Sequence, residues 1–321
     1  MQILNKNHAF FHQVILILLI LITAGIESLL SISVNVQIVL FLAITLSMGI
    51  FHGMLDIVLL RSLQFKQISY LVIYTALALA ALLFFLNFPN TALLALLILS
   101  VWHFGEAQQS DDSAKIETKT QLLSTQFIPR QFIPRRFLLG ACALAAPFML
   151  ANQSLHEILV ILLTDANWLL ITWTAWGVIA WAWLIAFFVC LIQLVIVKTM
   201  PFNYATLLEI LAIWLGFYLL SPLIAFSLYF GAYHAVRHIR DVLAKTKAVH
   251  MYKTALALVG IFTLSMLTLI TLILNNNIEI AGLNVTSSII LFQSSIVLLV
   301  AITLPHSFLI SIWRKKIYKS L

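Results

Sequence analysis

The stretch that decides the fold is residues 222–239, which read PLIAFSLYFGAYHAVRHI. As a helix it reaches across most of a bilayer, since crossing the hydrocarbon takes about 20 predominantly apolar residues. It nevertheless contains His234 and His238, which are four positions apart and therefore share one face of a helix. Because an ionisable side chain in hydrocarbon is costly, its presence there indicates a functional site by default. The stretch therefore predicts a membrane helix that presents a pair of functional histidines.

The rest of the chain has the same character. Of its 321 residues 63% are hydrophobic and only 9% are charged, whereas about a quarter of a soluble domain is charged. The apolar runs lack the short alternation of barrel strands, so they predict helices. We expect about ten transmembrane helices, near residues 14–34, 37–60, 69–88, 91–108, 137–152, 168–197, 204–220, 222–239, 254–274 and 287–311. The predicted fold is all-α: a polytopic integral membrane protein, surrounded by lipid, with a single domain over residues 1–321.

Two segments do not fit this pattern. Residues 155–164, LHEILVILLT, are too few to cross the membrane alone, which predicts a re-entrant or interfacial segment. Residues 109–136 form the one sizeable loop and close with the tandem repeat QFIPR-QFIPR. Because its two prolines forbid a regular helix across them, we interpret this loop as a flexible cytoplasmic connector.

The distribution of charge predicts the orientation. With ten spans, every Lys and Arg lies in the loops of one side or, for Arg237, just inside that end of its helix. Under the positive-inside rule both termini are then cytoplasmic, in a multi-pass protein of the cell inner membrane. The net charge of +7 comes from these short loops. No basic stripe with interleaved aromatic residues is present, so nucleic-acid binding is excluded.

Five histidines lie inside the predicted spans at similar depth. His52, His103 and His306 each precede the first cytoplasmic charge of their segment by eight or nine residues. At the rise of an α-helix this distance is roughly 12–14 Å, and His234 and His238 bracket the same depth. Four helices are therefore predicted to present imidazoles in one layer, which indicates a buried metal site.

The residue types near this layer restrict the metal. Neutral imidazole favours Zn, Cu, Fe or Ni over Mg or Ca, and the absence of nearby cysteine argues against a thiolate zinc site. Carboxylates follow three of the histidines at helical spacing and are expected to accept the second N–H of a metal-bound histidine, their own or a neighbour's. A lone membrane histidine can also simply hydrogen-bond a neighbouring helix, and this alternative is open for His306. The predicted ligands are His52, His103, His234 and His238; His306 is a possible additional ligand or site residue; and the supporting carboxylates are Asp56, Glu106 and Asp241.

Four short blocks carry a resemblance to a known family. FHGMLD (51–56), SVWHFGEAQ (100–108), YHAVRH (233–238) and LPH (304–306) resemble the Brp/Blh family of membrane β-carotene 15,15′-dioxygenases, which are bacteriorhodopsin-related proteins. The resemblance implies cleavage of β-carotene at its central double bond, with O2 as co-substrate, to give two molecules of retinal. It implies that His52, His103, His234 and His238 hold Fe(2+), and that a microbial rhodopsin could receive the retinal. One departure is Ile57, which stands where family members often have a polar or aromatic residue.

Two other functions agree with a buried histidine layer. Another metal-dependent membrane oxygenase or hydroxylase is the first, although a di-iron site of that kind uses more histidines than the five at this depth. The second is a transporter of metal ions or protons. Transporters often show internal repeats with a site at the midplane, whereas this sequence has no convincing repeat and its histidine layer is off-centre.

Overall fold

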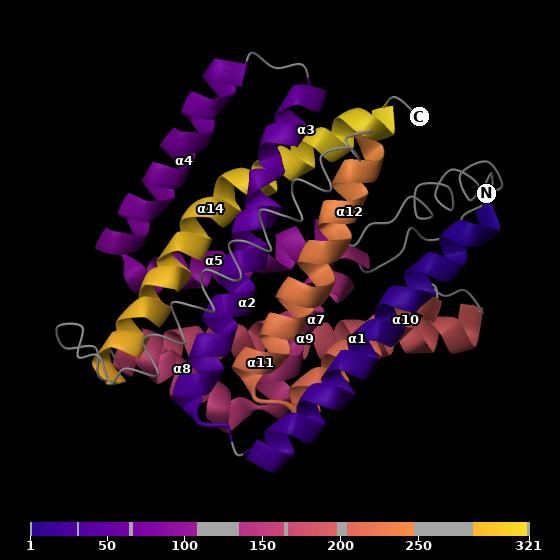
Figure 1. The fold of residues 1–321 in the computed structure, drawn as a ribbon. Helices are drawn as coiled ribbons and strands as arrows, with labels where there is room; N and C mark the ends of the chain where they lie inside the picture. The colour runs from indigo at the N-terminus through magenta and orange to yellow at the C-terminus, as the bar shows by residue number, and fades with distance from the viewer. Residues whose placement is uncertain are drawn as a thin grey trace.

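The computed structural model describes residues 2–30, 32–63, 67–107, 135–163, 166–197, 204–246 and 285–319. Within these ranges the chain forms helices and no strand, so the predicted all-α class is confirmed there (Figure 1). The elements are α1 (Gln2–Leu30), α2 (Val34–Met54), α3 (Asp56–Ser62), α4 (Gln67–Asn87), α5 (Pro89–Ala107), α7 (Arg135–Leu150), α8 (Asn152–Leu162), α9 (Ala166–Val197), α10 (Tyr204–Leu219), α11 (Pro222–Ser227), the π-helix η1 (Leu228–Ala235), α12 (Val236–Lys245) and α14 (Val285–Lys319).

The predicted spans that fall within these ranges each correspond to a helix or to a continuous run of helices. The predicted span 37–60 is divided between α2 and α3, and the span 222–239 is divided among α11, η1 and α12. The predicted span 254–274 and nearly all of the loop 109–136 lie outside the described residues.

Helices of membrane-crossing length are fewer than the predicted ten. Phe11–Leu30, Ala166–Ile192 and Ser295–Arg314 are long and apolar enough to cross a bilayer, among the described residues. Phe137–Leu150 and Gln153–Leu162 would form a fourth span if counted together, but they meet at an angle of 107°. This bend agrees with the expectation that residues 155–164 do not cross the membrane alone. Several other helices are apolar but shorter, and together these apolar helices support a membrane protein.

Small residues and indole donors hold α5, α7 and α9 together. A Cβ on Gly140 of α7 would lie only 1.9 Å from the backbone oxygen of Val101 in α5, so the two helix backbones are in direct contact. From the other side, Trp183 of α9 donates a hydrogen bond to the backbone oxygen of Leu138, over 2.6 Å. The result is a rigid three-helix unit that fixes the position of α5, which carries His103.

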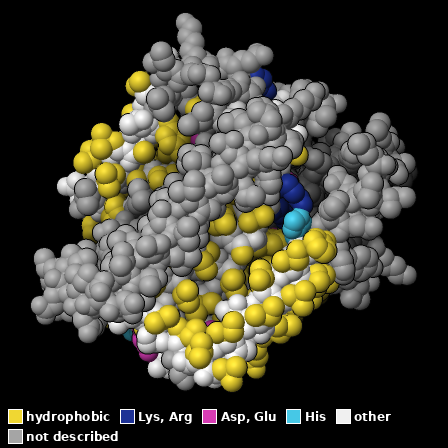
Figure 2. Space-filling model, in the orientation of Figure 1, with side chains coloured by type: hydrophobic (Ala, Val, Ile, Leu, Met, Phe, Trp, Pro, Cys, Tyr) yellow, Lys and Arg dark blue, Asp and Glu magenta, His cyan; other side chains and the backbone are white. Residues whose placement is uncertain are grey.

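The outward side chains are apolar. Leu18 and Ile22 of α1 are 52% and 60% exposed, and Trp181 and Ile185 of α9 are exposed to a similar degree. Figure 2 shows hydrophobic side chains covering much of the visible described surface, including the strip over α1. Exposed apolar surface of this extent is what a bilayer, rather than water, would cover.

Candidate metal centre

The five predicted histidines converge on one buried point. His52 lies near the end of α2, His103 near the end of α5, His234 in η1, His238 in α12 and His306 in α14, and each side chain is buried. The ring centroid of His52 is 4.2 Å from that of His238, 4.4 Å from His306, 5.5 Å from His234 and 5.9 Å from His103. The structure therefore brings together all five, with His52 at the centre.

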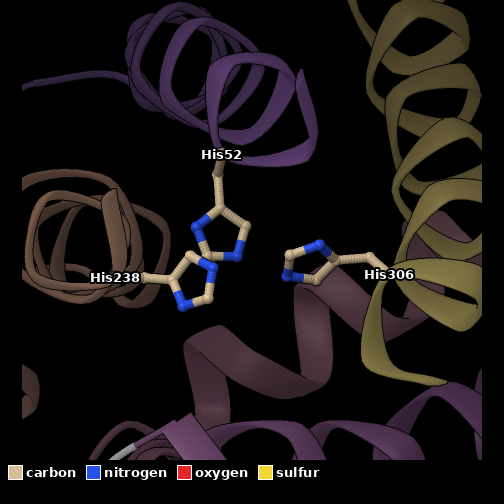
Figure 3. A group of neighbouring side chains, drawn as sticks. All are labelled: His52, His238 and His306. Atoms are coloured by element: carbon tan, nitrogen blue, oxygen red, sulfur yellow. The ribbon is translucent and has the colours of Figure 1, made fainter. Parts of the chain in front are cut away.

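Nitrogen atoms of these rings form two overlapping triads. His52, His238 and His306 make one, and His52, His103 and His234 make the other, with the possible ligand atoms of each triad within 4.8 Å of one another. Figure 3 shows the three rings of the first triad turned toward one another from three different helices. Two nitrogens that bind one ion at about 2.1 Å each lie no more than roughly 4.2 Å apart. The rings thus stand close to the separation that a shared ion requires.

Most of the inward nitrogen atoms have no hydrogen-bond partner in the described part of the chain. Both ring nitrogens of His52 and of His238, together with Nε2 of His234 and Nε2 of His306, are buried and unpartnered. Leaving a buried polar group unsatisfied costs about 1–3 kcal/mol, so such a concentration of unpartnered atoms needs a reason. An ion would satisfy several of them at once. An all-imidazole donor set suits iron as well as Zn, Cu or Ni, so these residues fit a ferrous ion.

His306 is held in the manner of a metal-binding histidine. Its Nδ1 lies 2.7 Å from Oδ1 of Asp56, and the hydroxyl of Tyr74 donates to Oδ2 of the same carboxylate over 2.8 Å. A carboxylate on one ring nitrogen fixes the ring's orientation and leaves the other nitrogen available to a metal. His103 has a comparable contact, since its Nδ1 is 3.2 Å from Oγ of Ser307. Asp56 therefore supports the histidine of a neighbouring helix and not His52, four positions before it.

The other two predicted carboxylates have different outcomes. Asp241 does not contact His238, whose two ring nitrogens have no hydrogen-bond partner among the described residues. The Asp241 carboxylate instead pairs with Arg240 at 3.6 Å and is 27% exposed. It lies one turn after His238, but on the part of α12 that turns outward. Glu106 belongs to α5, and its side chain lies outside the described residues.

A second cluster of polar side chains lies beside η1 and α12, which carry His234 and His238. Arg237 of α12 contacts Glu209 of α10 at 3.1 Å and the hydroxyl of Tyr233 at 3.3 Å. The amide of Gln13 in α1 donates to the same hydroxyl over 3.2 Å. Glu209 was not among the predicted site residues, although a lone acid in the apolar run 204–219 was a usable signal. Tyr74 and Ser307 were also missed, and hydroxyl residues in apolar helices give no comparable signal.

The π-helix η1 brings His234 close to α2. Single π turns within α-helices occur frequently at functional sites, and His234 is the last residue but one of this segment. Gly231, three residues before it, allows close approach, because a Cβ there would lie 2.4 Å from Cγ2 of Ile44 in α2. The backbone of η1 therefore packs directly on the helix that carries His52.

An apolar cavity leads away from the histidines. The cavity is partly open to the outside, and His52, His103 and His306 are among its lining residues. Apart from these, Ser100 and Thr303 are the polar side chains of a wall that is otherwise apolar or aromatic. In α2, α5 and α14 nearly all other lining residues precede the histidine in the chain, so the histidines stand at one end of the cavity. A concave apolar site with a few convergent polar groups is typical of a site for a small apolar ligand.

Comparison with known proteins gives a family but no individual relative. A search of curated proteins and a search of solved structures each found no match. The family model described as beta-carotene 15,15′-dioxygenase matches residues 41–314, a range that includes all five histidines, Asp56 and the described wall of the cavity. Because this match covers most of the chain, the protein belongs to the β-carotene 15,15′-dioxygenase family.

Proposed function

We propose that this protein cleaves β-carotene at the central 15,15′ double bond, in an iron-dependent reaction with O2 that gives two molecules of retinal. The observation that carries the proposal is the cluster of five buried histidines at one end of an apolar cavity. The family match supplies the substrate class. The cluster supplies ligands for a metal, and the cavity supplies space for a polyene.

We infer that His52, His103, His234 and His238 hold Fe(2+) and that His306 is an additional ligand. The unpartnered nitrogens support this set, and the contact between Asp56 and His306 supports the fifth member. Bound iron would supply the activation of O2, which is otherwise unreactive toward an alkene. The burial of the five histidine rings, their proximity to one another and their nitrogen donors all support this set of ligands.

The chain's own contribution is to bind, orient and exclude water. The apolar wall would hold the polyene against the histidines and keep water from the reacting carbons. Asp56 and Tyr74 would keep the His306 ring in one orientation. In the overall reaction the central C=C bond breaks, its two carbons are oxidised, and O2 is reduced. Each oxygen atom becomes the carbonyl oxygen of one retinal.

We further propose a membrane setting that suits this substrate. The protein would be a single domain over residues 1–321 with about ten spans and both termini cytoplasmic, in the cell inner membrane. The apolar exposed surface supports contact with lipid, and both chain ends lie in the upper right part of Figure 1. β-Carotene dissolves in bilayer hydrocarbon, so it could enter the cavity from the lipid. A microbial rhodopsin is the proposed acceptor of retinal.

Expression in cells that accumulate β-carotene tests the proposal. We expect the orange colour to fade and retinal to appear at two molecules for each β-carotene lost, measured by chromatography with mass detection. Cells that carry the His234→Ala variant serve as the control and should keep their carotene. Unchanged carotene with the protein present in the membrane would contradict the proposal, and unchanged carotene with altered metal uptake would favour transport instead.

A further inference from the structure

The length of the cavity can be measured along the helices that form it. On α2 its lining extends from His52 back to Phe41, and on α5 from His103 back to Leu93. These intervals of eleven and ten residues correspond to roughly 15–17 Å at the rise of an α-helix. On α14 the lining extends from His306 back to Phe292, an interval of fourteen residues or roughly 21 Å. The histidines and the far end are therefore roughly 15–21 Å apart.

Residues of α8 line the far end of the cavity. Leu155, Ile158, Leu159 and Leu162 of this helix all line the cavity. Ile158 and Leu162 pack against the cluster that contains Phe41 and Phe292, and Leu155 and Leu159 belong to the cluster of Leu93. The 107° bend between α7 and α8 is what turns this short helix toward the cavity. The segment that is too short to cross the membrane therefore forms a wall.

The cavity is deep enough to hold half of a symmetrical carotene. From the central double bond to the terminal ring, β-carotene has a zigzag of nine carbon–carbon bonds followed by the ring. At ordinary bond lengths this half is roughly 15 Å long. A ring seated against α8 would therefore place the middle of the polyene beside His52, His103 and His306. The second half would extend beyond the histidines, away from α8.

We propose that α8 is the end wall of the substrate cavity and that its distance from the histidines determines which double bond is cleaved. This inference rests on the proposed function. It assigns specificity to Ile158 in particular, because that residue lines the cavity and packs against the cluster that contains Phe41 and Phe292. The chemistry at the histidines would act on whichever double bond the wall places there.

A change in depth has a defined chemical consequence. If the polyene shifts by one conjugated double bond, cleavage falls beside the central bond. The broken C=C bond again gives two carbonyl groups, with one oxygen atom of O2 in each. The two products are now unequal, one shorter and one longer than retinal by one double-bond unit. Product identity therefore reports the depth of the cavity separately from the rate of the reaction.

The test compares two positions on α8. Ile158→Trp shortens the cavity and Ile158→Ala lengthens it. Val160→Trp and Val160→Ala are the matched controls, because Val160 is 51% exposed and does not line the cavity. Each variant is purified from membranes, its iron content is measured, and the products that it forms from β-carotene are identified by chromatography and mass spectrometry.

We expect the wild-type protein and both Val160 variants to give retinal alone. In the Ile158 variants, central cleavage should fall by about tenfold or more, since a displacement of 1 Å can cost about 100-fold in rate, and unequal products should appear. If the tryptophan variant does not accumulate, the products of the alanine variant alone test the end-wall assignment. Retinal alone from iron-loaded Ile158 variants would overturn the end-wall assignment. Absence of retinal from the wild-type protein would instead overturn the proposed function, and this inference with it.

Discussion

Asp56 is the residue at which three helices meet beside the histidines. It begins α3, its carboxylate contacts His306 of α14 at 2.7 Å, and it accepts a hydrogen bond from Tyr74 of α4. The carboxylate is buried, with 4% of its side chain exposed. A buried carboxylate in this position orients the imidazole and increases its basicity as a ligand. We therefore treat Asp56 as a positioning residue for the metal centre.

Asp56→Asn should weaken iron binding by about 10–100-fold, the usual effect of removing such a partner. Asparagine keeps the shape of the side chain but loses the charge that favours the ligand. Asp241→Asn is the matched control, because Asp241 pairs with Arg240 and does not contact His238. The measurement is an iron titration of metal-stripped protein. Equal iron affinity in Asp56→Asn and the wild-type protein would contradict this role.

At the scale of single residues, sequence spacing predicted the histidines but not their partners. The common depth of the histidines could be predicted because helical rise is constant, so residues at equal distance from a charged end lie in one layer. The partner of Asp56 could not be predicted in this way. Spacing identifies neighbours on one helix, whereas His306 reaches Asp56 from a helix 250 positions further along the chain. Asp241 follows His238 by three positions but pairs with Arg240, since proximity along a helix does not determine which way a side chain turns.

The contact between α5 and α7 is the tightest helix packing around the site. At Gly140 the nearest atom is the backbone oxygen of Val101, which cannot move aside as the end of a flexible side chain could. Val101 is two residues before His103, so any separation of these helices displaces a proposed ligand. Position 140 therefore requires glycine, because any Cβ there would collide with the backbone of α5.

Gly140→Ala should destabilise the protein by at least about 1–3 kcal/mol, the usual range for overpacking. We also expect it to lower the iron content. Gly25→Ala in α1 is the control, because a Cβ at Gly25 would have nothing within 4 Å. Thermal unfolding in detergent, followed for both variants and the wild-type protein, makes the comparison. Equal unfolding temperatures for Gly140→Ala and Gly25→Ala would show that the close contact is absent.

At the scale of elements, apolar runs predicted where helices lie but not how they are interrupted. A run of about 20 apolar residues is a strong signal, and it located the helices within the described residues. The π-helix η1 and the break between α2 and α3 had no comparable signal. Within η1, Gly231 lies close to Ile44 of α2, a contact between separate helices that spacing along one helix does not reveal. The short run 155–164 was recognised as unusual, but its place at the end of the cavity required the structure.

For the whole molecule, the distribution of basic residues predicts an even number of spans. Every Lys and Arg is assigned to one side by that count, and the positive-inside rule makes this side cytoplasmic. The upper ends of α3, α12 and α14 and the N-terminus lie toward the same part of Figure 1, which supports the arrangement.

Reporter fusions at the two ends test this orientation. We expect a cytoplasm-active reporter to be active at both the N-terminus and the C-terminus, and a periplasm-active reporter to be inactive at both. A fusion within residues 275–279, which are assigned to the opposite side, is the control and should give the reverse result. Termini on opposite sides of the membrane would contradict an even number of spans.

The central claim is that the five buried histidines bind one iron ion. Iron counted per chain in purified protein tests this most directly, in the wild-type protein, in His52→Ala and in His156→Ala. His52 belongs to both triads, whereas His156 lies on α8 beside Trp173 and away from the cluster. We predict a single iron ion per chain in the wild-type protein and in His156→Ala, and almost none in His52→Ala. Full iron content in His52→Ala, or no iron in a wild-type protein that still forms retinal, would contradict the account.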